Sequence, residues 1–174
     1  MGIRYYAYAF EDHMTDQALA FPRSILAGDP HADAWGGEPG ASISVITLVQ
    51  HTPERDMLYL DKAWRHLQII TGPEIRGAAA RPAHRMFEGA VTMDHDHMGW
   101  DPWLRVLRPA EVPAIAEDLE GISESEAKSL LRTRAYLGEE PEREIEYACL
   151  HFHRARTFMT HLRADGRGMV YMIG

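Results

Sequence analysis

The stretch PEREIEYACLHFHRARTFMTHLRADGRGMVYMIG, residues 141–174, decides the fold of this chain. At about 100° per residue, the apolar side chains of residues 141–164 gather on one broad side of a helix. They are Ile145, Ala148, Cys149, Phe152 and Met159, flanked by Tyr147, His151, Phe158 and Leu162. Only a narrow polar strip must face water, made of Glu146, His153, Thr157 and Thr160. Such a helix is expected to lie deep in a domain. Gly166 and Gly168 end it, and residues 169–173 are predicted to form a terminal strand that completes a sheet.

Strand and helix patterns alternate along the rest of the chain. Strand-like runs occupy residues 3–10, 43–49, 57–60, 86–93 and 103–107. The first run is aromatic and apolar on both alternating faces, which predicts a strand covered on both sides. Helices are predicted to begin at Asp61, acting as an N-cap, at Pro109, and after Ser123, which starts a capping box with Glu126. Residues 28–40, rich in glycine and proline, are interpreted as a loop. The pattern as a whole predicts a domain that contains both helices and strands.

Length and composition indicate one compact domain over the 174 residues. No run approaches the roughly 18 apolar residues of a membrane span. The N-terminus lacks the basic and apolar regions of a secretory signal. The single cysteine, Cys149, fits a reducing compartment, so we expect a cytoplasmic location.

Charge is unevenly distributed along the chain. The net charge of −8 argues against nucleic acid as a partner. Acids dominate residues 111–146, whereas residues 147–167 carry four arginines and only one acid. This polarity could steer a charged partner, although such a charge run is more often a solvated helical face.

Three segments carry a family resemblance. Residues 59–72 read YLDKAWRHLQIITG, residues 107–112 read LRPAEV, and residues 151–171 run from HF to GRGMVY. Together with the N-terminal Met-Gly-Ile, and in this order, they resemble the signatures of the YfbM-like family of uncharacterised bacterial proteins. The resemblance implies an α+β fold with a mostly antiparallel sheet. It implies no activity, because the family has no established catalytic residues to carry over.

This sequence departs from the family pattern in two places. Arg108 stands where the family usually has a capping serine, so that helix loses a cap worth about 1 kcal/mol. Residues 36–56 are also longer than in the short form of the family.

The strongest candidate for a binding surface is the start of the helix at Asp61. Lys62 and His66 are helical neighbours at i, i+4 and Arg65 is close by, which predicts a small basic face at a helix N-terminus. Such an end can hold an anion. The simpler interpretation is an N-cap, a core Trp64 and solvated bases.

The only candidate metal site is the run Asp94-His95-Asp96-His97. In an extended segment the two histidines would point the same way, and their nitrogens together with the carboxylates could bind a divalent cation. No further ligand can be named from the sequence, and a polar loop explains the same residues. We therefore expect no metal and no cofactor.

Four single residues complete the candidates. Arg156 lies near the apolar side of the last helix and is expected to form a buried ion pair, in which case Arg156→Met should cost roughly 3–5 kcal/mol. Alternatively its guanidinium extends to the surface, with a cost under about 1 kcal/mol, or faces a ligand. Trp100 and Trp35 could each centre a flat apolar docking patch. His151 flanks the buried side of the same helix and is expected to pack there with a hydrogen bond.

Two functional hypotheses follow from these residues. The leading one is a non-enzymatic binding protein for a protein or a small ligand, because no nucleophile elbow or phosphate-binding loop is present and Cys149 falls inside a helical stripe. The alternative is a small hydrolase or metal-dependent enzyme that uses Asp94 to His97.

Overall fold

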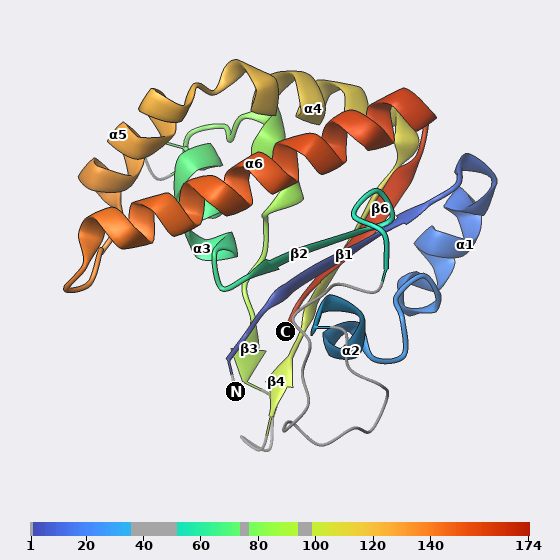
Figure 1. The fold of residues 1–174 in the computed structure, drawn as a ribbon. Coiled ribbons are helices and arrows are strands. Elements are labelled where there is room, and N and C mark those ends of the chain that lie inside the picture. The colour runs from blue at the N-terminus through green and yellow to red at the C-terminus, as the bar shows by residue number, and fades with distance from the viewer. Residues whose placement is uncertain (1, 36–51, 74–76, 94–98) are drawn as a thin grey trace.

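The computed structural model describes residues 2–35, 52–73, 77–93 and 99–174, and Figure 1 shows its fold. A four-stranded antiparallel sheet lies at its centre, in the order β2-β1-β6-β5. The strands are β1 Tyr5–Phe10, β2 Met57–Asp61, β5 Trp103–Leu107 and β6 Gly168–Ile173. The terminal strand β6 therefore pairs with β1 on one side and β5 on the other, in the middle of the sheet.

Both faces of this sheet are covered, as the aromatic run at residues 3–10 predicts. Alternate side chains of a strand point to opposite faces. Tyr5 and Ala7 belong to the main core with α3 to α6, and the Tyr5 ring stacks on Tyr171 with centroids 5.2 Å apart. Tyr6 and Tyr8 point the other way and pack against the segment around Ile25 to Ala34.

The helices form a layer on each side of the sheet. In Figure 1, α3 to α6 lie on one side, whereas α1 and α2 lie on the other. The α-helices are α1 Thr15–Ala20, α2 Pro30–Trp35, α3 Trp64–Thr71, α4 Val112–Gly121, α5 Glu124–Arg134 and α6 Pro141–Asp165. The short 3-10 helices are η1 Asp12–Met14, η2 Pro22–Ser24, η4 Pro82–Met86 and η5 Pro109–Glu111. A second, two-stranded sheet pairs β3 Thr92–Met93 with β4 Trp100–Asp101 in antiparallel orientation. This arrangement confirms an α+β fold with an antiparallel sheet.

The long helix α6 follows the prediction closely. Its buried residues are Ile145, Ala148, His151, Phe152, Ala155, Phe158, Met159 and Leu162. It ends at Gly166, whose φ of 66° is the left-handed conformation that glycine adopts without strain. The exposed strip is wider than predicted, because Leu150, Arg154 and His161 also face solvent.

Two predicted elements are wrong for identifiable reasons. Within the expected loop, Asp29 accepts a hydrogen bond from the Ala32 amide at 3.0 Å and Pro30 occupies the first helical position, so α2 forms there. The strand predicted at residues 86–93 is reduced to β3. Tyr5 donates its hydroxyl proton to the Met86 carbonyl at 2.9 Å, and Tyr171 likewise donates to Glu88 at 2.9 Å. Buried tyrosine hydroxyls therefore bind backbone carbonyls that would otherwise accept hydrogen bonds in a β-ladder.

Other boundaries agree with the sequence. The turn at Pro109 precedes α4, and the Ser123 hydroxyl accepts from the Glu126 amide at 3.1 Å at the start of α5. The strand predicted at residues 43–49 lies outside the described residues. Within the described part of the chain, no helix combines the length and the apolar character needed to cross a membrane.

Candidate functional site

Asp61 ends strand β2 and does not cap α3, whose N-cap is Ala63 with no side-chain hydrogen bond. Its φ of 45° is left-handed, a conformation that aspartate tolerates better than most residues. The carboxylate accepts hydrogen bonds from Arg4 Nε and the Tyr59 hydroxyl, each at 3.0 Å, and from the Tyr147 hydroxyl at 2.9 Å. Partial burial alone would raise the pKa of Asp61, but these three donors outweigh it and hold the pKa below its usual value.

The basic face expected beside Asp61 is divided among different partners. The Lys62 amide donates to the Tyr147 hydroxyl at 3.3 Å. His66 Nε2 lies 3.5 Å from the carboxylate of Glu144 on α6. The Arg65 guanidinium sits over the indole ring of Trp64, 5.3 Å from its centroid. The side chains of His66 and Arg65 therefore engage separate groups, whereas Lys62 contributes its backbone amide. Asp61 with its donors joins the residue before β1 to β2 and α6.

Trp64 is mainly a core residue, as the simpler interpretation expects. It is 5% exposed, and its indole nitrogen donates to the Ile3 carbonyl at 3.4 Å. With Arg65 and Gln68 it lines a shallow surface hollow of about 390 Å³. Trp100, on β4, is 54% exposed and pairs across the short ladder with Met93, which is 50% exposed.

Arg156 lacks the carboxylate partner that the sequence analysis expects. The structure gives its guanidinium one hydrogen bond, from an Nη to the Ile122 carbonyl at 2.6 Å, and a face-on contact with the Phe152 ring at 5.0 Å. Ile122 is the C-cap of α4, where the helix dipole favours a positive charge. No described carboxylate forms an ion pair with Arg156, so the expected buried ion pair is wrong.

This contact pattern lowers the expected cost of removing Arg156. Arg156→Met should reduce the free energy of unfolding by about 1.5–3 kcal/mol, the range for a hydrogen bond that involves a charged group. Urea denaturation of the variant and the parent measures this difference. Arg156→Lys, which keeps the charge but loses the planar stack, is the matched control and should lie between the two. A loss above about 4 kcal/mol would instead indicate a stranded buried charge.

The metal hypothesis at Asp94, His95, Asp96 and His97 lies outside the described residues and stays a prediction, as does the apolar patch around the Trp35 side chain. Elsewhere, the described ranges contain no group of three histidine, cysteine, aspartate or glutamate side chains placed to hold a metal ion. Burial raises the pKa of the Cys149 thiol, which opposes its use as a nucleophile.

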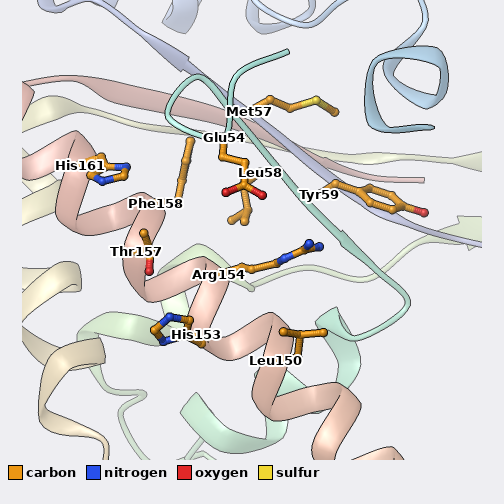
Figure 2. Close-up of a pocket in the computed structure, with 10 residues that line it drawn as sticks. All are labelled: Glu54, Met57, Leu58, Tyr59, Leu150, His153, Arg154, Thr157, Phe158 and His161. Atoms are coloured by element: carbon orange, nitrogen blue, oxygen red, sulfur yellow. The ribbon is translucent and has the colours of Figure 1, made fainter. Parts of the chain in front are cut away.

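A more enclosed hollow lies elsewhere, between β2 and α6, and Figure 2 shows the residues that line it. We call it the β2–α6 groove. Its volume is about 270 Å³, and its lining residues are Glu54, Met57, Leu58, Tyr59, Leu150, His153, Arg154, Thr157, Phe158 and His161. None of these residues was predicted as a site residue.

The floor of the β2–α6 groove is apolar and its rim is polar. Met57, Leu58 and Phe158 are at most 4% exposed and form the floor. Along the rim, His153, Thr157 and His161 follow one another at intervals of four residues, so they share one side of α6. An apolar surface with a few polar groups around it is the usual composition of a small-molecule site.

Arg154 is the one arginine or lysine among the described residues that line the β2–α6 groove. Its guanidinium makes no hydrogen bond or ion pair with any described residue, although its charge reaches the buried His151 ring. Neighbouring arginines are paired, for example Arg163 with Glu120 at 2.7 Å and Arg55 with Asp165 at 3.0 Å. Arg154 therefore offers unused donors beside an apolar floor.

The sequence contains part of the signal for this groove. His153 and Thr157 belong to the polar strip predicted for the last helix, and Arg154 extends that strip. The sequence pattern does not indicate that Glu54 and β2 form the other wall of the groove. They are distant from α6 along the chain, and only tertiary packing places them against it.

Comparisons with known proteins bear on the fold. The chain is similar to the crystal structure of YfbM, a protein of unknown function from Escherichia coli, with a TM-score of 0.59 and 16% sequence identity. The match covers 99% of this chain and 100% of the other. No protein-family model matches the sequence, and a comparison with curated proteins gives no match. The resemblance to the YfbM-like family is thus confirmed at the level of the fold.

Proposed function

We propose that this protein is a non-enzymatic binding protein whose β2–α6 groove holds a small ligand with an anionic group and an apolar portion. The observation that carries the proposal is Arg154, an arginine without a hydrogen-bonded or ion-paired partner among the described residues, at the rim of an apolar hollow. A carboxylate or phosphate matches the fork of donors that a guanidinium presents.

The size of the β2–α6 groove favours a small ligand over a protein partner. A stable protein interface buries roughly 800 Å² on each side, whereas this hollow holds only a small molecule. The buried floor of Met57, Leu58 and Phe158 can remove the apolar part of a ligand from water, which contributes roughly 25 cal/mol for each Å² buried.

The residues around the β2–α6 groove favour binding over catalysis. Its two histidines, His153 and His161, have no carboxylate hydrogen-bonded to them among the described residues, so no triad-like relay orients either ring. The alternative of a small hydrolase or metal-dependent enzyme at Asp94 to His97 stays a prediction. A cytoplasmic location is part of our proposal and is supported by the lone Cys149.

The proposal predicts that a simple branched acid binds in the β2–α6 groove. A titration with 4-methylpentanoate, followed by amide NMR shifts, should perturb residues of β2 and of α6 between Leu150 and His161. At about half a kcal/mol per non-hydrogen atom, the Kd should be near 1 mM. The uncharged amide of the same acid should bind at least about tenfold more weakly, because it lacks the charge that Arg154 recognises.

Replacing Arg154 tests the role of its charge. Arg154→Gln should weaken 4-methylpentanoate binding by about tenfold or more, since it removes a charge-assisted hydrogen bond worth roughly 1.5–3 kcal/mol. Arg143→Gln is the matched control, because Arg143 lies on the same helix, is 80% exposed and pairs with Glu140 away from the β2–α6 groove. Equal weakening by both variants, or no shifts in the groove at all, would contradict the proposal.

A further inference from the structure

Two opposite charges line the β2–α6 groove without pairing. Glu54 lies in the turn before β2, and Arg154 lies on α6. Neither makes a hydrogen bond or an ion pair with a described residue. Figure 2 shows both side chains extending into the space between the strand and the helix, Glu54 from the strand side and Arg154 from the helix side.

Pairing is the rule for the surrounding charges. Arg55 and Arg167, next to the same turn and helix, bind Asp165 and Asp56 at 3.0 and 2.7 Å. Within the described part of the chain, Glu54 and Arg154 therefore differ from these neighbours in having no partner, and they lie on the two walls of the β2–α6 groove.

We infer that the ligand of the β2–α6 groove is a zwitterion of the amino-acid type, with an apolar side chain. Its carboxylate would bind Arg154, its ammonium would bind Glu54, and its side chain would pack on Met57, Leu58 and Phe158. This inference rests on the proposed function and adds the chemical class of the ligand.

Charge complementarity selects this class over simpler ones. A plain carboxylic acid satisfies Arg154 but places a second negative charge near Glu54. A plain amine satisfies Glu54 but lies near an uncompensated guanidinium. Only a molecule with both charges pairs with Arg154 and also with Glu54. A plain acid or a plain amine is disfavoured, because its single charge lies near a residue of the same sign.

The volume agrees with an amino acid. The 270 Å³ of the β2–α6 groove corresponds to about nine water molecules at roughly 30 Å³ each, which is space for a ligand of roughly ten non-hydrogen atoms. Leucine has this size. The rim residues His153, Thr157 and His161 supply further polar atoms on the α6 side.

Three probes that differ by one group each test the inference. L-Leucine, 4-methylpentanoate and 3-methylbutylamine share a branched apolar chain, but the second lacks the ammonium group and the third lacks the carboxylate. Amide NMR titrations should give leucine the lowest Kd, at least about tenfold below either of the others, since each missing pair removes a charge-assisted contact.

Variants of Glu54 and Arg154 test the two proposed ligand contacts separately. Glu54→Gln should cancel the advantage of leucine over 4-methylpentanoate while leaving the acid bound as well as before or better. Arg154→Gln should weaken leucine and the acid but not the amine. Both residues are exposed, so unchanged amide spectra outside the groove and an unchanged melting temperature establish that the variants fold.

The outcomes distinguish this inference from the proposed function. If 4-methylpentanoate binds as tightly as leucine and Glu54→Gln changes neither Kd, the zwitterion is ruled out while the anion site stands. If none of the three probes shifts residues of the β2–α6 groove, the proposed function fails together with the inference.

Discussion

A chain that ends at Arg167 is expected to lose its cooperative melt and to aggregate. The truncation removes β6, which lies between β1 and β5. Its side chains Met169, Val170, Tyr171 and Ile173 are all fully buried. Burying such a side chain contributes about 1.5–3 kcal/mol, so the four together account for about 6–12 kcal/mol, as much as the whole stability of a typical domain. Two strands would also be left with open edges, which promotes aggregation.

Differential scanning calorimetry and size-exclusion chromatography measure this result. A chain that ends at Ile173 is the matched control, because it loses only Gly174, whose backbone exchanges two hydrogen bonds of 2.9 Å with Arg4. The control should keep a single cooperative transition at a cost of about 1–3 kcal/mol. That single transition would also support our proposal that the chain is one domain. A chain ending at Arg167 that stayed monomeric and melted within a few degrees of the parent would refute the prediction.

Acidification is expected to destabilise this protein through His151. The ring is 5% exposed and packs edge-on against Tyr147, with centroids 4.6 Å apart. The hydrogen bond that the sequence analysis expects is absent at Nδ1, which is buried without a partner among the described residues. Burial, and next the charge of Arg154, lower the pKa of His151 from 6.5 to about 4.

The direction of the pH effect follows from this lowered pKa. Between pH 6.5 and pH 4 the unfolded chain binds a proton at His151 that the folded chain does not bind. Stability is therefore unaffected by this group above pH 6.5, falls as the pH decreases through the window, and levels off below about pH 4. At 1.36 kcal/mol per pKa unit, the loss amounts to about 2–4 kcal/mol.

His151→Phe isolates this contribution. Urea denaturation between pH 7 and pH 4 should show the variant gaining about 2–4 kcal/mol relative to the parent as the pH falls. Acid-induced losses at shared carboxylates such as Asp61 cancel in that difference. His13→Phe, at an exposed position near the N-terminus, is the control for removing a histidine. If the stability curves of parent and His151→Phe run parallel over this range, the buried neutral imidazole is not the acid-sensitive group.

The contrast between Asp61 and Ser123 shows where sequence reasoning succeeds and where it fails. Ser123 caps its helix as predicted, because a cap depends only on a hydroxyl and an amide three residues away. Asp61 has the same local signature, but Arg4, Tyr59 and Tyr147 compete for its carboxylate. Two of these three donors come from distant elements, so no local pattern could show that their hydrogen bonds replace the helix cap.

Arg156 and Arg154 show the same limit within one helix. The helical wheel correctly places Arg156 near the apolar side, but it cannot show that the Ile122 carbonyl is its partner. It also gives no reason to prefer Arg154, because Arg154 faces a groove only where β2 and Glu54 lie against α6.

The sequence by itself determined the long helix α6, the strands at both ends of the chain, and the α+β class, because hydrophobic periodicity, capping residues and glycine stops act over a few residues. The tertiary structure alone decided that β6 is central, that the buried His151 Nδ1 has no hydrogen-bond partner among the described residues, and that the β2–α6 groove exists. These features depend on contacts between residues that are distant along the chain. They are stabilised by the packing of the sheet and helices as a whole, so no short stretch of the sequence indicates them.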